Sequence, residues 1–184
     1  MKMDACDGKR HTLVDDYLHE HGPLRSGQLQ CVLVFRGSQG SGKSLTLNLL
    51  IDKLRRKATE RIGSKAIIGE GSLDCNKDTG TVDRWLCVAI FGFRILVYTA
   101  GDDGEAVKAA ISLANAYQCD VLVTASRTRS DSLSFETLEA ELKRLETPYI
   151  QEWRSEENPP EKTPEKQADE LVAGLERLCS PTMR

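Results

Sequence analysis

One short segment of the chain combines residue types and spacing that suit phosphate chemistry. Residues 37–44 read Gly-Ser-Gln-Gly-Ser-Gly-Lys-Ser. The glycines let backbone N–H groups approach phosphate oxygens without a Cβ atom in the way. Lys43 carries a charge that can neutralise terminal phosphates, and Ser44 carries a hydroxyl that can bind Mg²⁺. The segment therefore predicts a phosphate-binding loop.

The elements on either side of this loop fit the same interpretation. Residues 29–35 form a short apolar run typical of a buried strand, and residues 44–58 carry apolar side chains at helical spacing. A helix that begins at Lys43 directs its unpaired N–H groups and the positive end of its dipole at a bound anion. The alternative is a glycine-rich turn that binds nothing, and the complete pattern between a strand and a helix argues against it.

The segment fits G-x-x-x-x-G-K-[ST] at every fixed position and resembles the Walker A motif of the P-loop NTPases. The resemblance implies a nucleoside triphosphate bound with Mg²⁺, with Ser44 as a metal ligand and Lys43, a catalytic residue, at the β- and γ-phosphates. The amide of Leu45 would face the α-phosphate. The residues expected to hold the nucleotide are Gly37, Ser38, Gln39, Gly40, Ser41, Gly42, Lys43, Ser44 and Leu45.

A P-loop also needs an acidic residue that organises magnesium and water. Asp102 and Asp103 lie a few residues beyond the apolar run 94–97. We expect one of them, Asp102 first, to be catalytic, and we expect Asp102 to be the metal ligand. A typical Walker B aspartate would occupy the position of Tyr98, so both acids are displaced. Asp102 with Glu105 also matches a capping box for the following helix, and both roles remain open.

The segment Tyr98-Thr-Ala-Gly101 resembles the D-T-A-G switch segment of small GTPases, with Tyr98 in place of the aspartate. Guanine recognition in that family depends on N-K-x-D. The near match Asn76-Lys-Asp78 has its aspartate one residue early, and it lies upstream of the switch-like segment. By elimination we expect adenine as the base, and therefore ATP rather than GTP.

Two arginines follow the expected strand 121–123. If this strand is parallel to the P-loop strand, Arg127 and Arg129 leave it toward the edge where ligands of open α/β sheets bind. Arg127 is therefore a candidate catalytic residue at the γ-phosphate or at an anionic acceptor, because a guanidinium fork suits phosphate. The alternative is a pair of solvated arginines. Asp131 and Ser132 are more simply N-cap residues of the next helix.

The order of the remaining segments predicts an α/β fold, because strands and helices alternate. We expect a three-layer P-loop NTPase sheet, mainly parallel with one antiparallel hairpin, and a C-terminal helix. The hairpin joins residues 85–90 to residues 93–98 through a tight turn at Gly92. A polar loop is expected over 70–83. The other expected elements are strands at 65–69, 120–124 and 149–153 and helices at 105–117 and 133–145.

Shifts in composition divide the chain into four parts. Residues 1–28 form a polar segment with a short helix at 11–20, and residues 29–153 form the P-loop NTPase domain. Residues 154–167 form a linker rich in proline, glutamate and lysine. Residues 168–184 form an amphipathic helix, which we expect to fold back on the domain or, alternatively, to bind a protein partner.

Composition and charge exclude several classes of protein. The 184 residues carry 25 Lys+Arg against 28 Asp+Glu, a net charge of −3, and the hydrophobic share of 40% suits one globular domain. Mild acidity gives no general attraction for nucleic acid, and the basic residues at 53–57 suit a solvated helix C-terminus. No apolar run approaches the ~20 residues of a membrane span, and the first residues lack a secretory signal. We therefore expect a cytoplasmic protein.

The metal-binding residue types form no recognisable motif. The six cysteines include no CxxC pair and no zinc quartet, so we expect reduced thiols, several of which fill the core as small hydrophobic groups. His19 and His21 offer only two imidazoles, which we expect to make a poor metal site.

These observations predict Mg²⁺-dependent binding of a nucleoside triphosphate, ATP by elimination, and its hydrolysis by a small P-loop ATPase. A small-molecule or nucleotide kinase is the first alternative, favoured by the compact size and by Arg127 and Arg129. A non-catalytic nucleotide sensor or a GTPase-like switch is the second, favoured by the displaced acids.

Overall fold

The computed structural model describes residues 13–22, 24, 28–37, 40–75, 82–127, 133–153 and 163–180. Several residues named above lie outside these ranges, namely Ser38, Gln39, Asn76, Asp78, Arg129, Asp131 and Ser132.

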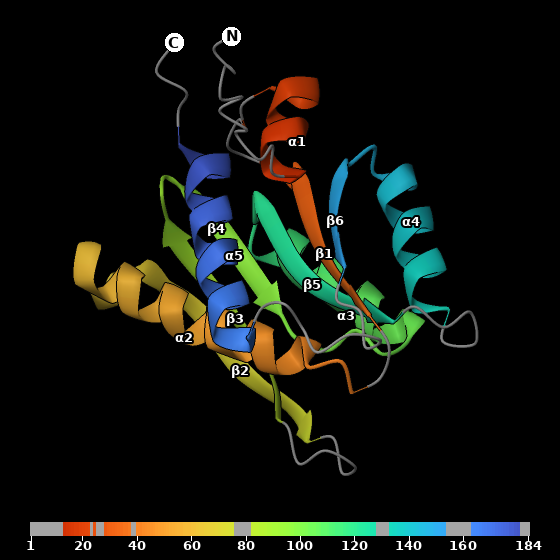
Figure 1. Cartoon of the computed structure of the whole chain (residues 1–184), viewed down its shortest axis with the longest axis horizontal. Helices are drawn as coiled ribbons and strands as arrows, with labels where there is room; N and C mark the ends of the chain where they lie inside the picture. The colour runs from red at the N-terminus through yellow and green to blue at the C-terminus, as the bar shows by residue number, and fades with distance from the viewer. Residues whose placement is uncertain are drawn as a thin grey trace, which may run out of the picture.

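The described residues form an alternating series of helices and strands (Figure 1). The helices are α1 Leu13–His21, α2 Lys43–Arg61, the 3₁₀ turn η1 Ser64–Ala66, α3 Gly104–Ala116, α4 Ser134–Arg144 and α5 Pro164–Cys179. The strands are β1 Cys31–Gly37, β2 Ile67–Cys75, β3 Val82–Ile90, β4 Phe93–Tyr98, β5 Val121–Arg127 and β6 Tyr149–Trp153. Within the described residues, no helix is both long enough and apolar enough to cross a bilayer.

The strands form one mixed sheet in the order β2-β3-β4-β5-β1-β6. The pairs β4–β5, β5–β1 and β1–β6 are parallel, whereas β3 is antiparallel to both of its neighbours. The turn between β3 and β4 places Phe91 and Gly92 at φ 58° and 84°, the left-handed backbone of a tight two-residue hairpin. The predicted α/β fold, its mainly parallel sheet and its hairpin are therefore confirmed.

Strand β2 is longer than the sequence predicted. The predicted loop over 70–83 is wrong over 70–75 and 82–83, because β2 continues to Cys75 and β3 begins at Val82. The glycines in this segment are strand positions that two aromatic rings cover. A Cβ atom at Gly69 would lie 2.7 Å from the Tyr117 hydroxyl, and one at Gly71 would lie 2.5 Å from the Trp85 indole nitrogen.

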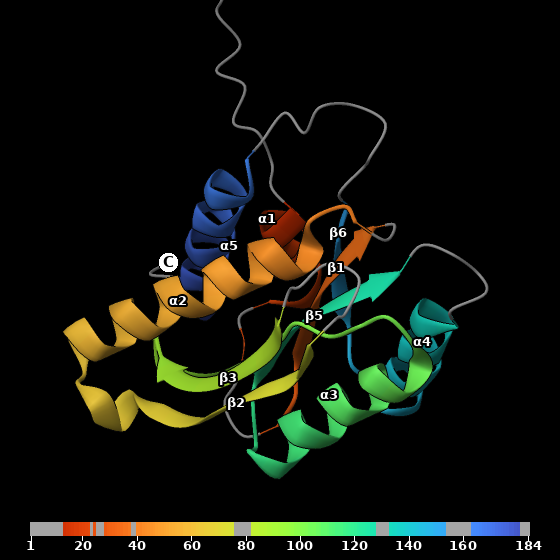
Figure 2. The same cartoon turned by 90° about the horizontal axis from the view of Figure 1, so that it is seen from below.

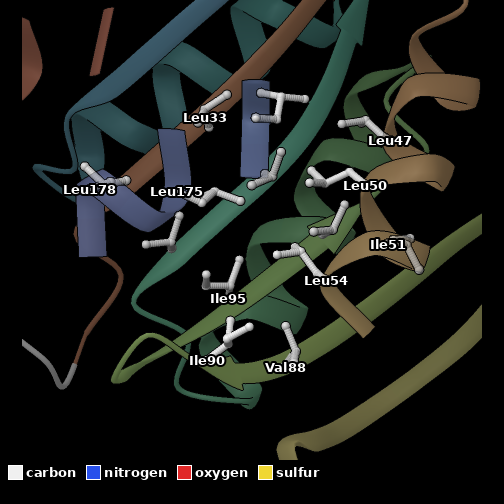
Figure 3. Packing of buried hydrophobic residues seen from close by; sticks show 14 of the residues in the cluster. Leu33, Leu47, Leu50, Ile51, Leu54, Val88, Ile90, Ile95, Leu175 and Leu178 are labelled. Atoms are coloured by element: carbon white, nitrogen blue, oxygen red, sulfur yellow. The ribbon is translucent and has the colours of Figure 1, made fainter. Parts of the chain in front are cut away.

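Helices cover both faces of the sheet (Figure 2). Helices α1, α2 and α5 lie on one face, where Leu50, Leu54 and Leu175 pack against strand residues such as Ile95 (Figure 3). Helices α3 and α4 lie on the other face and bury a second cluster that includes Leu138. The two hydrophobic clusters fix the sheet between its helices, since their side chains alternate along the same strands.

Helix α5 folds back on the domain, which is the first of the two alternatives predicted for it. It begins at Pro164 and not at 168, because proline suits the first helical position and the Thr163 hydroxyl accepts a hydrogen bond of 3.2 Å from the Lys166 N–H. The last four residues of the predicted linker 154–167 are therefore helical, and the predicted helix ends at Cys179. Leu171, Leu175 and Leu178 bury its apolar face.

The basic end of α2 is paired with α5, so the expectation of a merely solvated helix end is wrong. Lys53 forms ion pairs of 2.8 Å with both Glu165 and Asp169. Lys57 and Arg61 lie 2.8 and 3.0 Å from Glu176. Arg55 pairs with Glu70 of β2. Acidic residues far along the chain therefore neutralise the cluster.

We expect apolar burial to hold α5 in place more strongly than these ion pairs. Leu175→Ala should lower the free energy of unfolding by about 2–4 kcal/mol, because Leu175 is fully buried. Glu176→Gln should cost only about 0.5–1 kcal/mol, since its ion pairs are partly exposed. Hydrogen bonding to Lys57 is the main cause that lowers the pKa of Glu176. The stabilisation that the ionised Glu176 carboxylate provides is therefore present at neutral pH and is lost as the pH falls through its lowered pKa. Urea denaturation of both variants at pH 7 checks the order, and equal losses would contradict it.

Candidate functional site

The carboxyl ends of the parallel strands meet at one edge of the sheet, and this edge carries the predicted site residues. β1 and β5 pair in register from Cys31 opposite Val121 to Gly37 opposite Arg127. The first glycine of the loop therefore lies beside Arg127, on the neighbouring strand. Ligands of open α/β sheets bind outside such strand ends.

The glycine-rich loop connects β1 to α2. Gly40 and Gly42 both have φ of 80°, a left-handed conformation that side chains disfavour, so glycine is required at both positions. Gly42 is the N-cap residue of α2, and Lys43 is the first helical residue. The loop thus turns the chain sharply from the strand into the helix.

Lys43 points back into the loop and is only 6% exposed. Its Nζ atom donates a hydrogen bond of 2.8 Å to the Gly37 carbonyl and lies 3.4 Å from the Ser41 hydroxyl oxygen. The ammonium group is therefore held at the mouth of the loop by its own backbone. Buried cations of this kind require polar partners, because burial of a charge is otherwise costly.

The N-terminus of α2 carries no negative side chain. Its first turn contains no acidic residue, and Gly42 has no side chain with which to cap it. By contrast, Asp103 caps α3 and Thr163 caps α5 through side-chain oxygens. A lysine at this end opposes the helix dipole, since the N-terminus of a helix already carries partial positive charge. An anion at this position would be stabilised by both the dipole and Lys43.

The structure brings two further predicted residues together. Arg127 at the end of β5 forms a two-point ion pair with Asp102, which lies in the segment between β4 and α3. The Nε atom lies 2.8 Å from Asp102 Oδ1, and Nη2 lies 2.7 Å from Oδ2. The arginine is largely covered and the aspartate half-exposed. The sequence predicted that both residues lie near the glycine-rich loop and gave no indication that they pair.

The capping role belongs to Asp103, so the capping box predicted from Asp102 is wrong. The Asp103 carboxylate accepts a hydrogen bond of 2.8 Å from the Ala106 N–H, and α3 begins at Gly104. Either aspartate has a suitable side chain, and the residue that leads directly into the first helical residue takes the position. Asp102 is therefore left to face Arg127.

Sequence reasoning missed the serine that holds this segment in place. The Ser134 hydroxyl, at the start of α4, lies 2.9 Å from the Gly101 carbonyl and 2.8 Å from the Ser126 hydroxyl. It also accepts a hydrogen bond of 3.0 Å from the Arg127 N–H. One buried hydroxyl thus joins the end of β5 to the segment that carries Asp102. No local pattern identifies it, because its partners are distant in sequence.

The end of β4 is lined by acids that include a residue missed from the sequence. Tyr98, at the expected aspartate position, is buried, and its hydroxyl has a pKa raised by burial and by the charges of Asp83 and Asp103. Asp83 accepts a hydrogen bond of 2.9 Å from the Thr99 hydroxyl. That hydroxyl in turn accepts one of 2.8 Å from the Arg84 N–H. The continuation of β3 into the expected loop is what brings Asp83 here.

The described residues include no group of three or more acidic, histidine or cysteine side chains that could hold a metal ion by themselves. Of the residues expected from the sequence to bind a nucleotide, Gly37, Gly40, Ser41, Gly42, Lys43, Ser44 and Leu45 lie in the described loop and helix. Ser44 is half-buried in the first turn of α2, whereas Leu45 is half-exposed.

No protein-family model matches the chain, and neither any curated protein nor any solved structure shows significant similarity to it. The interpretation of the site therefore depends on its own residues and their geometry.

The close contact between Gly101 and the backbone of β5 can be tested by substitution. A Cβ atom at Gly101 would collide with the backbone carbonyl of Ala125. Gly101→Ala should therefore lower the free energy of unfolding by about 1–3 kcal/mol, because neither backbone can move aside easily. The matched control is Gly174→Ala in α5, where the nearest atom would lie at an ordinary 3.4 Å. Thermal denaturation should show a loss for Gly101→Ala only, and equal midpoints would contradict this packing.

Proposed function

We propose that the chain is a P-loop nucleoside triphosphatase that binds ATP with Mg²⁺ and hydrolyses the γ-phosphate. The observation that carries the proposal is the loop between β1 and α2. There the buried Lys43 begins a helix whose first turn has no acidic residue, and the neighbouring strand β5 ends at Arg127. The complete Walker A pattern at residues 37–44 gives the anion its chemical class.

Electrostatics support a polyphosphate ligand. The first-turn amides of α2 and the Lys43 ammonium group present positive charge to the same point. A phosphate there would accept hydrogen bonds from first-turn N–H groups, since the N-cap residue Gly42 has no side chain with which to cap them. Lys43 could exchange its 2.8 Å bond to the Gly37 carbonyl for a bond to a phosphate oxygen, with little movement of its stem.

The residues at the carboxyl edge of the sheet suit the way in which Mg²⁺ is usually bound beside phosphates. This ion takes one or two protein ligands and completes its shell with phosphate oxygens and water, so a three-residue cluster is not needed. Ser44 would contribute its hydroxyl. Asp102 is half-exposed, and its oxygens can accept further hydrogen bonds from metal-bound water, since a carboxylate has about four acceptor sites. When bound, the metal would supply charge neutralisation at the β- and γ-phosphates.

Arg127 is the candidate for stabilising negative charge on the γ-phosphate during transfer. Its backbone lies beside Gly37, and its guanidinium group is held in one orientation by Asp102. A planar fork already oriented by a carboxylate loses little freedom when it contacts a phosphate.

The same ion pair favours a second candidate, a nucleotide sensor that does not hydrolyse its ligand. Asp102 and Arg127 neutralise each other, so neither charge is fully available to the nucleotide while they are paired. A sensor would use Lys43 and the loop for binding alone.

Incubation of the protein with γ-labelled ATP, Mg²⁺ and a panel of small acceptors separates these functions. Release of labelled inorganic phosphate without labelled acceptor is the expected result. Transfer of the label to an acceptor would instead identify a kinase, and tight binding without turnover would identify a sensor. Either of those results would overturn the proposed hydrolysis.

Lys43→Ala should weaken triphosphate binding or turnover by about 2–4 kcal/mol, because it removes one main electrostatic contact to the phosphates. Lys65→Ala is the matched control, since it removes one exposed lysine from η1, beyond the far end of α2. Circular dichroism should confirm that both variants fold. A Lys43→Ala protein with unchanged affinity and rate would refute the assignment.

Asp102→Asn should reduce Mg²⁺-dependent turnover about tenfold or more, since the amide loses the charge that organises the metal shell and orients Arg127. The matched variant Asp103→Asn keeps its capping role, because asparagine caps helices about as well as aspartate. It should retain most of the activity. Phosphate-release assays on the two proteins give the comparison, and equal rates would exclude a special role for Asp102.

A further inference from the structure

Two buried cysteines lie in contact on the side of the sheet covered by α3. The Sγ atoms of Cys87, in β3, and Cys119, just before β5, are 3.5 Å apart, although the residues are separated by 32 positions. Both side chains are almost fully buried. Neither residue belongs to the glycine-rich loop or to the edge that carries Asp102 and Arg127.

Strand β4 holds the two thiols in this arrangement. Cys87 pairs directly with Leu96 of β4. The segment with Cys119 is bound to the same strand, because Asp120 accepts a hydrogen bond of 2.8 Å from the Arg94 N–H and donates its own N–H to the Arg94 carbonyl at 2.9 Å. A disulfide requires sulfur atoms about 2.05 Å apart, so closure needs a shift of only about 1.5 Å, shared between two side chains.

The surroundings give the two sulfur atoms different chemistry. The hydrogen bond from Cys119 lowers the pKa of Cys87, and the positive charge of Arg94 acts in the same direction. The pKa of Cys119 is raised by the same hydrogen bond and by burial, and Arg94 lowers it as it does that of Cys87, so the hydrogen bond is what distinguishes the two thiols. The Arg94 guanidinium is anchored by a 3.1 Å hydrogen bond to the Tyr117 carbonyl. Cys87 is therefore the better thiolate nucleophile, and Cys119 is placed as the thiol that resolves its oxidised form.

A groove opens beside the residues that flank this pair. A groove of about 440 Å³ is lined by Ala89, Arg94, Gln118 and Asp120, among others. Ala89 follows Cys87 by two residues on the same face of β3, and Gln118 and Asp120 flank Cys119. The groove is thus lined by sequence neighbours of both cysteines, whereas the thiols themselves are buried.

We propose that Cys87 and Cys119 form a redox modification site that closes to a disulfide when a hydroperoxide enters this groove. The Cys87 thiolate attacks the peroxide oxygen and becomes a sulfenic acid, and the O–O bond breaks with release of hydroxide. The Cys119 sulfur then attacks the Cys87 sulfur, the S–O bond breaks, and water leaves with the Cys119 proton. In total, two thiols and hydrogen peroxide give one disulfide and two waters. A dithiol reductant reverses the reaction.

Two other buried cysteines serve as internal controls. Burial raises the pKa of both Cys31 and Cys179 to about 12. The Cys31 thiol lies next to Tyr17 in the core on the opposite face of the sheet. Neither has a cation that would stabilise its thiolate among the causes of its shift. They should remain reduced under conditions that oxidise Cys87.

The test is disulfide mapping of the native, full-length protein. The protein is treated with hydrogen peroxide, quenched with an alkylating reagent in denaturant, and digested with trypsin, which places Cys87 in peptide 85–94 and Cys119 in peptide 109–127. We expect the two peptides to be joined and to separate after dithiothreitol. Recovery of both as alkylated thiols, or a linkage of either to another cysteine instead, would overturn the proposal.

Single substitutions resolve the order of the steps. In Cys119→Ala the peroxide should leave Cys87 as a sulfenic acid that dimedone traps, whereas Cys87→Ala should leave Cys119 unmodified. The control Cys31→Ala should still form the Cys87–Cys119 linkage. The reverse pattern of dimedone labelling would contradict the assigned roles, and the mapping of the unsubstituted protein decides the site even where a variant does not fold.

Discussion

The parallel pairing of β1 with β5 is the interaction on which the candidate site depends. It places Gly37 directly beside Arg127, so the start of the glycine-rich loop and the arginine lie on neighbouring strands. Asp102 follows β4, which lies two strands from β1 and so about 10 Å away at the usual strand spacing. The long Arg127 side chain comes from the intervening strand and connects the acid to the edge that carries the glycine-rich loop.

The two ends of α2 differ in how their positive charge is compensated. At the N-terminus, the buried Lys43 and the helix dipole present positive charge, and the first turn contains no acidic residue. Near the C-terminus the basic residues are matched by acids of α5, which also buries its apolar face against the domain. Ion pairs with α5 thus offset basic charge near the C-terminus of the helix, whereas its first turn contains no acidic residue.

The parts of this structure that local sequence determines were predictable, and the parts that depend on distant pairing were not. The loop, the hairpin through Gly92 and the alternation of strands and helices follow from turn chemistry and hydrophobic periodicity. The ion pair of Asp102 with Arg127 depends on the order of strands in the sheet, which no local pattern specifies. Gly71 fell in the predicted loop over 70–83, because the Trp85 ring that covers it comes from another strand. Of two adjacent aspartates, only the observed helix start identifies Asp103 as the cap.

Titration calorimetry of the full chain with ATP in the presence of Mg²⁺ is the most direct test of the central claim that the loop at residues 37–44 binds a triphosphate. The account predicts saturable binding at one site per chain and a higher midpoint of thermal unfolding with the nucleotide than without it. Absence of both binding heat and midpoint shift, with ATP and with GTP, would contradict it.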